Sequence, residues 1–75
     1  MRYTHRIMVK YTQPDGTSNI EALLLATSSR EARQLLKAWK ANAQSCSSLA
    51  AVKKSAATFR ASNGFEAKAW IEVLQ

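Results

Sequence analysis

Ala26-Thr27-Ser28-Ser29-Arg30-Glu31-Ala32-Arg33-Gln34-Leu35-Leu36 aligns without a gap with Ala61-Ser62-Asn63-Gly64-Phe65-Glu66-Ala67-Lys68-Ala69-Trp70-Ile71. Each segment reads as the end of a strand, a polar cap residue and the start of an amphipathic helix. This repeated junction predicts two helices, each of which follows a strand.

The first junction carries a capping box, because Ser28 precedes Glu31 by three residues. An apolar stripe with helical spacing follows, formed by Ala32, Leu35, Leu36, Trp39 and Ala43. The pattern fades between Ala41 and Ser48, where Ser, Asn and Gln accumulate. We therefore predict a helix that begins at Ser28 and ends within that interval.

The sequence before this helix predicts an antiparallel hairpin. Residues 2–12 alternate with a period of two, which is typical of a strand. Gln13-Pro14-Asp15-Gly16 is a turn signal, because proline presets φ and glycine accepts a positive φ. Ile20–Thr27, apolar on both faces at its centre, reads as the second strand.

The last third of the chain supports two interpretations. Asn63-Gly64 favours a hairpin, but a two-residue loop pairs Phe59 with Lys68 and gives neither face a consistent apolar side. As a helix, the segment has an N-cap at Asn63 and a stripe formed by Ala67, Trp70, Ile71 and Leu74. We predict a strand over about 53–61 and a terminal helix; residues 48–61 could also be helical and 65–74 a strand.

The predicted fold is a single α+β domain over residues 1–75, with two helices on one face of a three-stranded sheet. The element order is β-β-α-β-α, with β-β-α-β-β as the alternative. A right-handed crossover through the first helix would place the third strand parallel to the second. Trp39 and Trp70 occupy equivalent helix stripes and are predicted in the core, while Arg6, Met8 and Lys10 lie on the open sheet face.

The composition predicts a binding protein rather than an enzyme. His5 and Cys46 are the only residues of their types, and the two glycines form no phosphate-binding loop. We therefore predict no catalytic site, no cofactor and no metal. The longest apolar run is too short to cross a bilayer, so we predict a cytoplasmic protein without a membrane partner.

Positive charge is the feature that points to a partner. Eleven Lys and Arg against five Asp and Glu give a net charge of +6, which favours an anionic partner. The first helix places four cations within an arc of about 80°, on the side away from its apolar stripe. The predicted nucleic-acid-binding residues are Arg30, Arg33, Lys37 and Lys40, with Arg6 and Lys10 on the sheet as secondary contacts.

The order of turn, strand, cap and helix from Tyr11 to Trp39 resembles the arm-type DNA-binding domain of phage integrases. That resemblance implies a small sheet domain that binds duplex DNA. The short length and charged surface also resemble small phage-encoded proteins such as anti-CRISPR inhibitors. The expected partner is thus nucleic acid, or alternatively an acidic face of a protein complex that handles nucleic acid. A homodimer is left open, because so small a chain has little core of its own.

Overall fold

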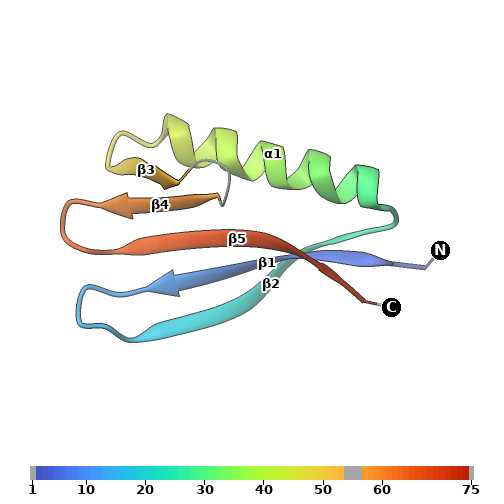
Figure 1. Ribbon diagram of the computed structural model, residues 1–75, viewed down its shortest axis with the longest axis horizontal. Coiled ribbons are helices and arrows are strands. Elements are labelled where there is room, and N and C mark those ends of the chain that lie inside the picture. The colour runs from blue at the N-terminus through green and yellow to red at the C-terminus, as the bar shows by residue number, and fades with distance from the viewer. Residues whose placement is uncertain (1, 54–56, 75) are drawn as a thin grey trace.

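A computed structural model describes residues 2–53 and 57–74. Its elements are β1 (His5–Thr12), β2 (Ser18–Ala26), α1 (Ser29–Ser45), β3 (Leu49–Lys53), β4 (Thr58–Ala61) and β5 (Glu66–Val73). The strands form one five-stranded sheet in the order β2-β1-β5-β4-β3, and every pairing is antiparallel. The helix α1 runs along the molecule and packs on one face of this sheet (Figure 1).

The predicted first hairpin is confirmed. The strands β1 and β2 pair from His5 opposite Ala26 to Thr12 opposite Ser18. In the turn, Gly16 adopts a φ of +94°, and the Asp15 carboxylate accepts hydrogen bonds from the backbone N–H and hydroxyl of Thr17, at 2.9 and 2.7 Å. These bonds favour the charged carboxylate, so the pKa of Asp15 lies below its ordinary value.

The predicted helix start and end are also confirmed. The Glu31 backbone N–H donates to the Ser28 hydroxyl at 3.1 Å, and the Glu31 carboxylate accepts from the Thr27 backbone N–H at 2.9 Å. In a standard capping box this carboxylate would accept from the backbone N–H of the cap residue Ser28; here it accepts from Thr27, one residue earlier. The helix ends at Ser45, inside the predicted interval.

Removing this cap should destabilise the protein measurably. Ser28→Ala is expected to cost about 1 kcal/mol, which lowers the melting temperature of a domain this size by about 4–8 °C. Ser29→Ala is the matched control, because it makes the same change one residue further on, at the first helical position. Thermal unfolding followed by circular dichroism measures both, and equal shifts for the two variants would contradict the assignment of Ser28 as the cap.

The core lies between α1 and one sheet face, and it contains few large side chains. Ile7, Val9 and Phe59 are fully buried. Small residues cluster with Ile7 and allow the helix to approach the sheet closely, namely Ala26, Ala32, Ala57 and Ala69. Trp39 of the helix packs edge-to-face against Phe59, with ring centroids 5.7 Å apart. The predicted stripe on α1 is therefore the surface that covers the sheet.

The prediction of a second helix is wrong. Residues Glu66–Val73 form β5, which lies between β1 and β4 in the middle of the sheet. The hairpin loop has three residues rather than two, because the Ala61 backbone N–H donates to the Phe65 carbonyl at 2.7 Å and Gly64 takes a φ of +99°. This register places Phe59 opposite Ala67 and buries both.

The predicted parallel third strand over about 53–61 is wrong too. Its place is taken by β3 and β4, which pair antiparallel, and residues 54–56 of that prediction lie outside the described residues. The helical alternative also fails, because Leu49–Lys53 is a strand. Among the described residues, one helix on a five-stranded sheet replaces both the three-stranded fold with two helices and the β-β-α-β-β alternative.

Candidate nucleic-acid interface

The outer face of α1 carries the four cations that the sequence singled out. Arg30, Arg33 and Lys37 are exposed, and Lys40 is half-buried at the flank of the face. The two ion pairs found among the described residues involve none of them. Glu31, the acidic residue of the same helix, is held at the helix start by its bond to Thr27. This basic helix face, formed by Arg30, Arg33, Lys37 and Lys40, is therefore positive from the first turn of α1 to Lys40.

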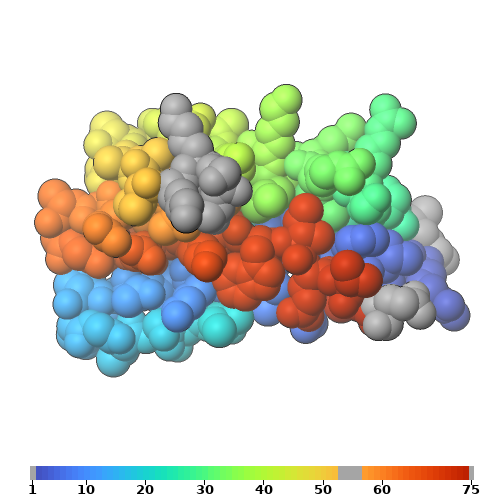
Figure 2. Space-filling view, in the orientation of Figure 1, coloured from blue at the N-terminus to red at the C-terminus, as the bar shows by residue number. Residues whose placement is uncertain are grey.

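The dimensions of this face suit a polyanion. At about 1.5 Å per residue, Arg30 and Lys40 are separated by about 15 Å along the helix axis. Over that length duplex DNA presents several phosphates, because it carries one negative charge per about 1.7 Å of its axis. Figure 2 shows the side chains of α1, in green to yellow, projecting along one long margin of the molecule. A duplex or a single strand could therefore contact the face without displacing any other element.

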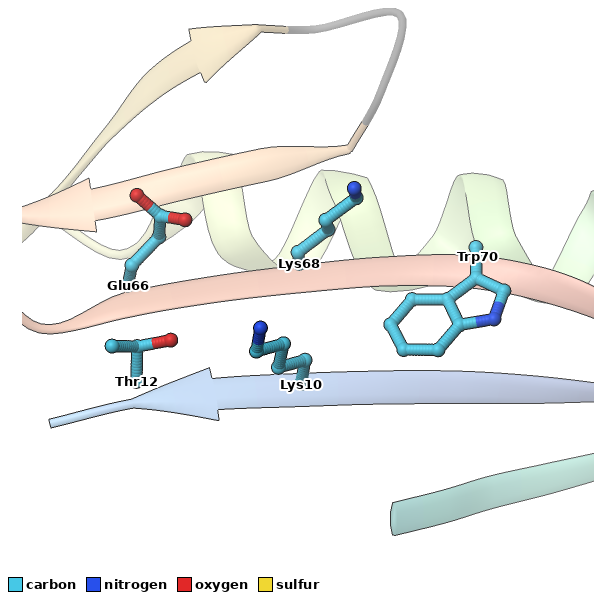
Figure 3. A pocket seen from close by; sticks show the side chains of 5 residues that line it. All are labelled: Lys10, Thr12, Glu66, Lys68 and Trp70. Carbon is cyan, nitrogen blue, oxygen red and sulfur yellow. The ribbon is translucent and has the colours of Figure 1, made fainter. Parts of the chain in front are cut away.

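A second polar surface lies on the sheet face opposite the helix. There β1 and β5 frame a shallow hollow of about 430 Å³, lined by Lys10, Thr12, Glu66, Lys68 and Trp70 (Figure 3). Lys10 and Lys68 are cross-strand partners, and like charges placed directly opposite each other destabilise a sheet. The indole of Trp70 forms one wall of the hollow (Figure 3), so the prediction that Trp70 occupies a helix stripe in the core is wrong.

Ion pairs flank this hollow on both sides. The Arg6 guanidinium pairs with Glu72 across β1 and β5, and Arg60 pairs with Glu66 across β4 and β5 at 2.8 Å. Lys10 and Lys68 form no ion pair among the described residues. The open sheet face therefore carries less uncompensated charge than the helix.

The six predicted binding residues thus separate into two groups. Arg30, Arg33, Lys37 and Lys40 share the helix face, whereas Arg6 and Lys10 lie on the opposite side of the sheet and cannot share one flat contact with them. Sequence reasoning missed Lys68, Trp70 and Arg60 as their neighbours. The alternation of Glu66, Lys68, Trp70 and Glu72 with apolar residues is the sequence signal for this strand face, and it competes with the helical stripe in the same segment.

The single histidine and the single cysteine form hydrogen bonds with neighbouring residues. Nδ1 of His5 is hydrogen-bonded to the Thr4 hydroxyl at 2.7 Å. Cys46 is exposed just after α1. Hydrogen bonding to the side chain of Ser48, and to a smaller extent to its backbone, lowers the pKa of the Cys46 thiol. Within residues 2–53 and 57–74, no three His, Cys, Asp or Glu side chains gather as metal ligands would. The helix of this part of the chain is not long and apolar enough to span a membrane.

No protein-family model, no curated protein and no solved structure matches this chain.

Proposed function

We propose that the protein is a non-enzymatic module that binds nucleic acid through the basic helix face. The observation that carries the proposal is the set of four cations on one side of α1 that form no ion pair among the described residues. Like charges at i, i+3 and i+4 repel each other on a solvated helix. A polyanion relieves this repulsion, and the release of its counterions adds to the affinity.

The helix face is a better phosphate-binding surface than the open sheet face. Four cations follow one another along α1, whereas the cations beside the hollow are interrupted by Glu66 and Glu72. Exposed Lys and Arg side chains on a helix can also adjust to phosphates at different spacings. Such contacts position a protein on nucleic acid without reading its sequence. The proposed binding is therefore independent of sequence.

Binding should depend steeply on salt. Four phosphate contacts predict a slope of about −3.6 for log K against log salt on duplex DNA, and about −2.8 on a single strand. Raising the salt fourfold should thus weaken duplex binding by about 150-fold. Fluorescence anisotropy with random-sequence duplex DNA, single-stranded DNA and RNA at two salt concentrations measures the affinity and the slope.

Each outcome of this titration is informative. Tight binding with a slope near the predicted value supports the proposal and identifies the preferred polymer. Absence of binding at low salt would overturn it, and the basic helix face would then be assigned to an acidic surface of a protein, as in the inhibitor alternative. A slope near zero with measurable binding would also overturn it, because contacts other than phosphates would then supply the affinity.

A further inference from the structure

The protein exposes more surface than a folded monomer of its mass normally does. Its accessible surface is 5171 Å², whereas a typical monomer of 8.3 kDa exposes about 4,600 Å². The radius of gyration is 12.8 Å, against about 11.3 Å for a compact chain of this length. The excess of about 600 Å² approaches the roughly 800 Å² that each partner buries in a standard interface.

Much of the exposed apolar surface lies on β2, the strand at one edge of the sheet. Ile20, Leu23, Leu24 and Leu25 are 59, 41, 42 and 48% exposed. Leu24 pairs with Ile7 on the helix side and Leu25 pairs with Arg6 on the open side, so the strand is apolar on both faces. Tyr3 and Ala22 complete a shallow depression of about 450 Å³ with the three leucines.

This edge carries few of the devices that normally prevent two sheets from pairing. Edge strands are commonly protected by charged side chains, especially lysine, or by proline. The β2 sequence Ser-Asn-Ile-Glu-Ala-Leu-Leu-Leu-Ala contains no Lys, Arg or Pro and one charged residue, Glu21. A single register shift opposite Ile7 and Met8 is its only irregularity among the described pairs.

Charge restricts where a second copy can dock. A chain with a net charge of +6 repels itself wherever cations meet, which disfavours contacts through the basic helix face or through Lys10 and Lys68. The β2 edge lies on the long margin opposite α1 in the view of Figure 2, where it is coloured cyan. It is thus a surface of low positive charge, large apolar area and unpaired backbone groups.

We propose that the protein forms a homodimer in which the β2 edges of two copies pair antiparallel and join the two sheets into one. A two-fold axis makes such a contact self-complementary, because the same residues face each other from both sides. The exposed run Ala22–Leu25 supplies apolar side chains to both faces of the joint. The backbone N–H and C=O groups on the outer side of β2 would then form hydrogen bonds with the same groups of the second copy.

The dimer also changes how the basic helix face is presented. Antiparallel strands of one sheet are related by a two-fold axis perpendicular to the sheet, so both copies of α1 lie on the same side. Two basic faces on one side of a continuous sheet make a bivalent surface for a polyanion. This last step rests on the proposed function, whereas the dimer itself does not.

The oligomeric state of paired edge variants tests the proposal. Leu24→Lys places a charge on β2, and Val52→Lys makes a matched change on β3, the other edge strand, where Val52 is 48% exposed. Sedimentation velocity should show wild type and Val52→Lys at twice the monomer mass of 8.3 kDa. Leu24→Lys should weaken dimerisation at least tenfold and retain the wild-type circular dichroism spectrum.

A second measurement keeps the test decisive if Leu24→Lys does not fold. Amide hydrogen exchange of the wild-type protein should slow in β2 as the protein concentration rises, with no change in β3. A monomer at all concentrations, or a dimer lost in Val52→Lys but kept in Leu24→Lys, would overturn the β2 interface. A dimer that binds no nucleic acid would leave the interface standing and remove the proposed function.

Discussion

Phe59→Ala is expected to cost about 3–5 kcal/mol of folding free energy. A domain of 75 residues has about 4–11 kcal/mol in total, so this single substitution can remove most of its stability. Phe59 is fully buried and joins two parts of the core: its ring packs against Trp39 of the helix, and its backbone pairs with Ala67 of β5. Its cross-strand partners, Ala51 and Ala67, are too small to fill the resulting cavity.

Chemical denaturation followed by tryptophan fluorescence measures the loss, because Trp39 reports directly on the contact with Phe59. Phe65→Ala is the matched control. Phe65 is half-buried and stacks on Tyr11 near the end of the molecule, with ring centroids 5.9 Å apart. Phe65→Ala removes a half-buried ring and one stacking contact, so it should cost less than Phe59→Ala, about 1–2 kcal/mol. Equal losses in the two variants would contradict the central position of Phe59 in the core.

The first half of the fold could be predicted from local signals. The alternation in β1, the Pro-Asp-Gly turn and the capping box at Ser28 each depend on neighbours within a few residues of each other. The hydrogen bonds of Asp15 and Glu31 then form where these signals place them. Local chemistry was sufficient because these elements need no distant partner to define their type.

The second half could not be predicted in this way, because its partner is far away in the sequence. Glu66–Val73 is a strand because β1, some sixty residues earlier, pairs with it along its whole length. The Ala-Lys-Ala run has good helix propensity, and tertiary pairing overrides it. The correct loop differs from the rejected one by a single residue, and a shift of one residue reverses which side chains are buried.

The same error affected the candidate site. In a helix Trp70 would lie on the apolar stripe, whereas in β5 it lies beside Lys10 and Lys68 in the hollow. The cations of α1, in contrast, depend on helical spacing alone, so their common face follows from the sequence once the helix is correct. Two separate basic surfaces result, and only a direct comparison of them can assign the binding.

Reversing two charges on the helix should therefore weaken binding strongly, while the same reversal on the sheet should not. Arg33→Glu with Lys37→Glu removes two of four phosphate contacts, which halves the predicted salt slope from about −3.6 to about −1.8. The two new carboxylates also repel the polymer. We expect the affinity at low salt to fall by at least about 100-fold, because each lost contact is worth roughly tenfold under these conditions.

Lys10→Glu with Lys68→Glu is the matched control. In this variant, as in the helix variant, two neighbouring positive charges become two neighbouring negative charges. The net charge of the chain changes equally in both variants, so a nonspecific effect of total charge weakens binding equally. The affinities of the two variants differ only if the nucleic acid binds at one of the two surfaces. If the sheet variant loses affinity and the helix variant keeps it, the nucleic acid lies on the open sheet face, where Trp70 can stack on a base. Circular dichroism of both variants shows that any difference comes from the contact surface, since all four positions are exposed and their replacement leaves the core intact.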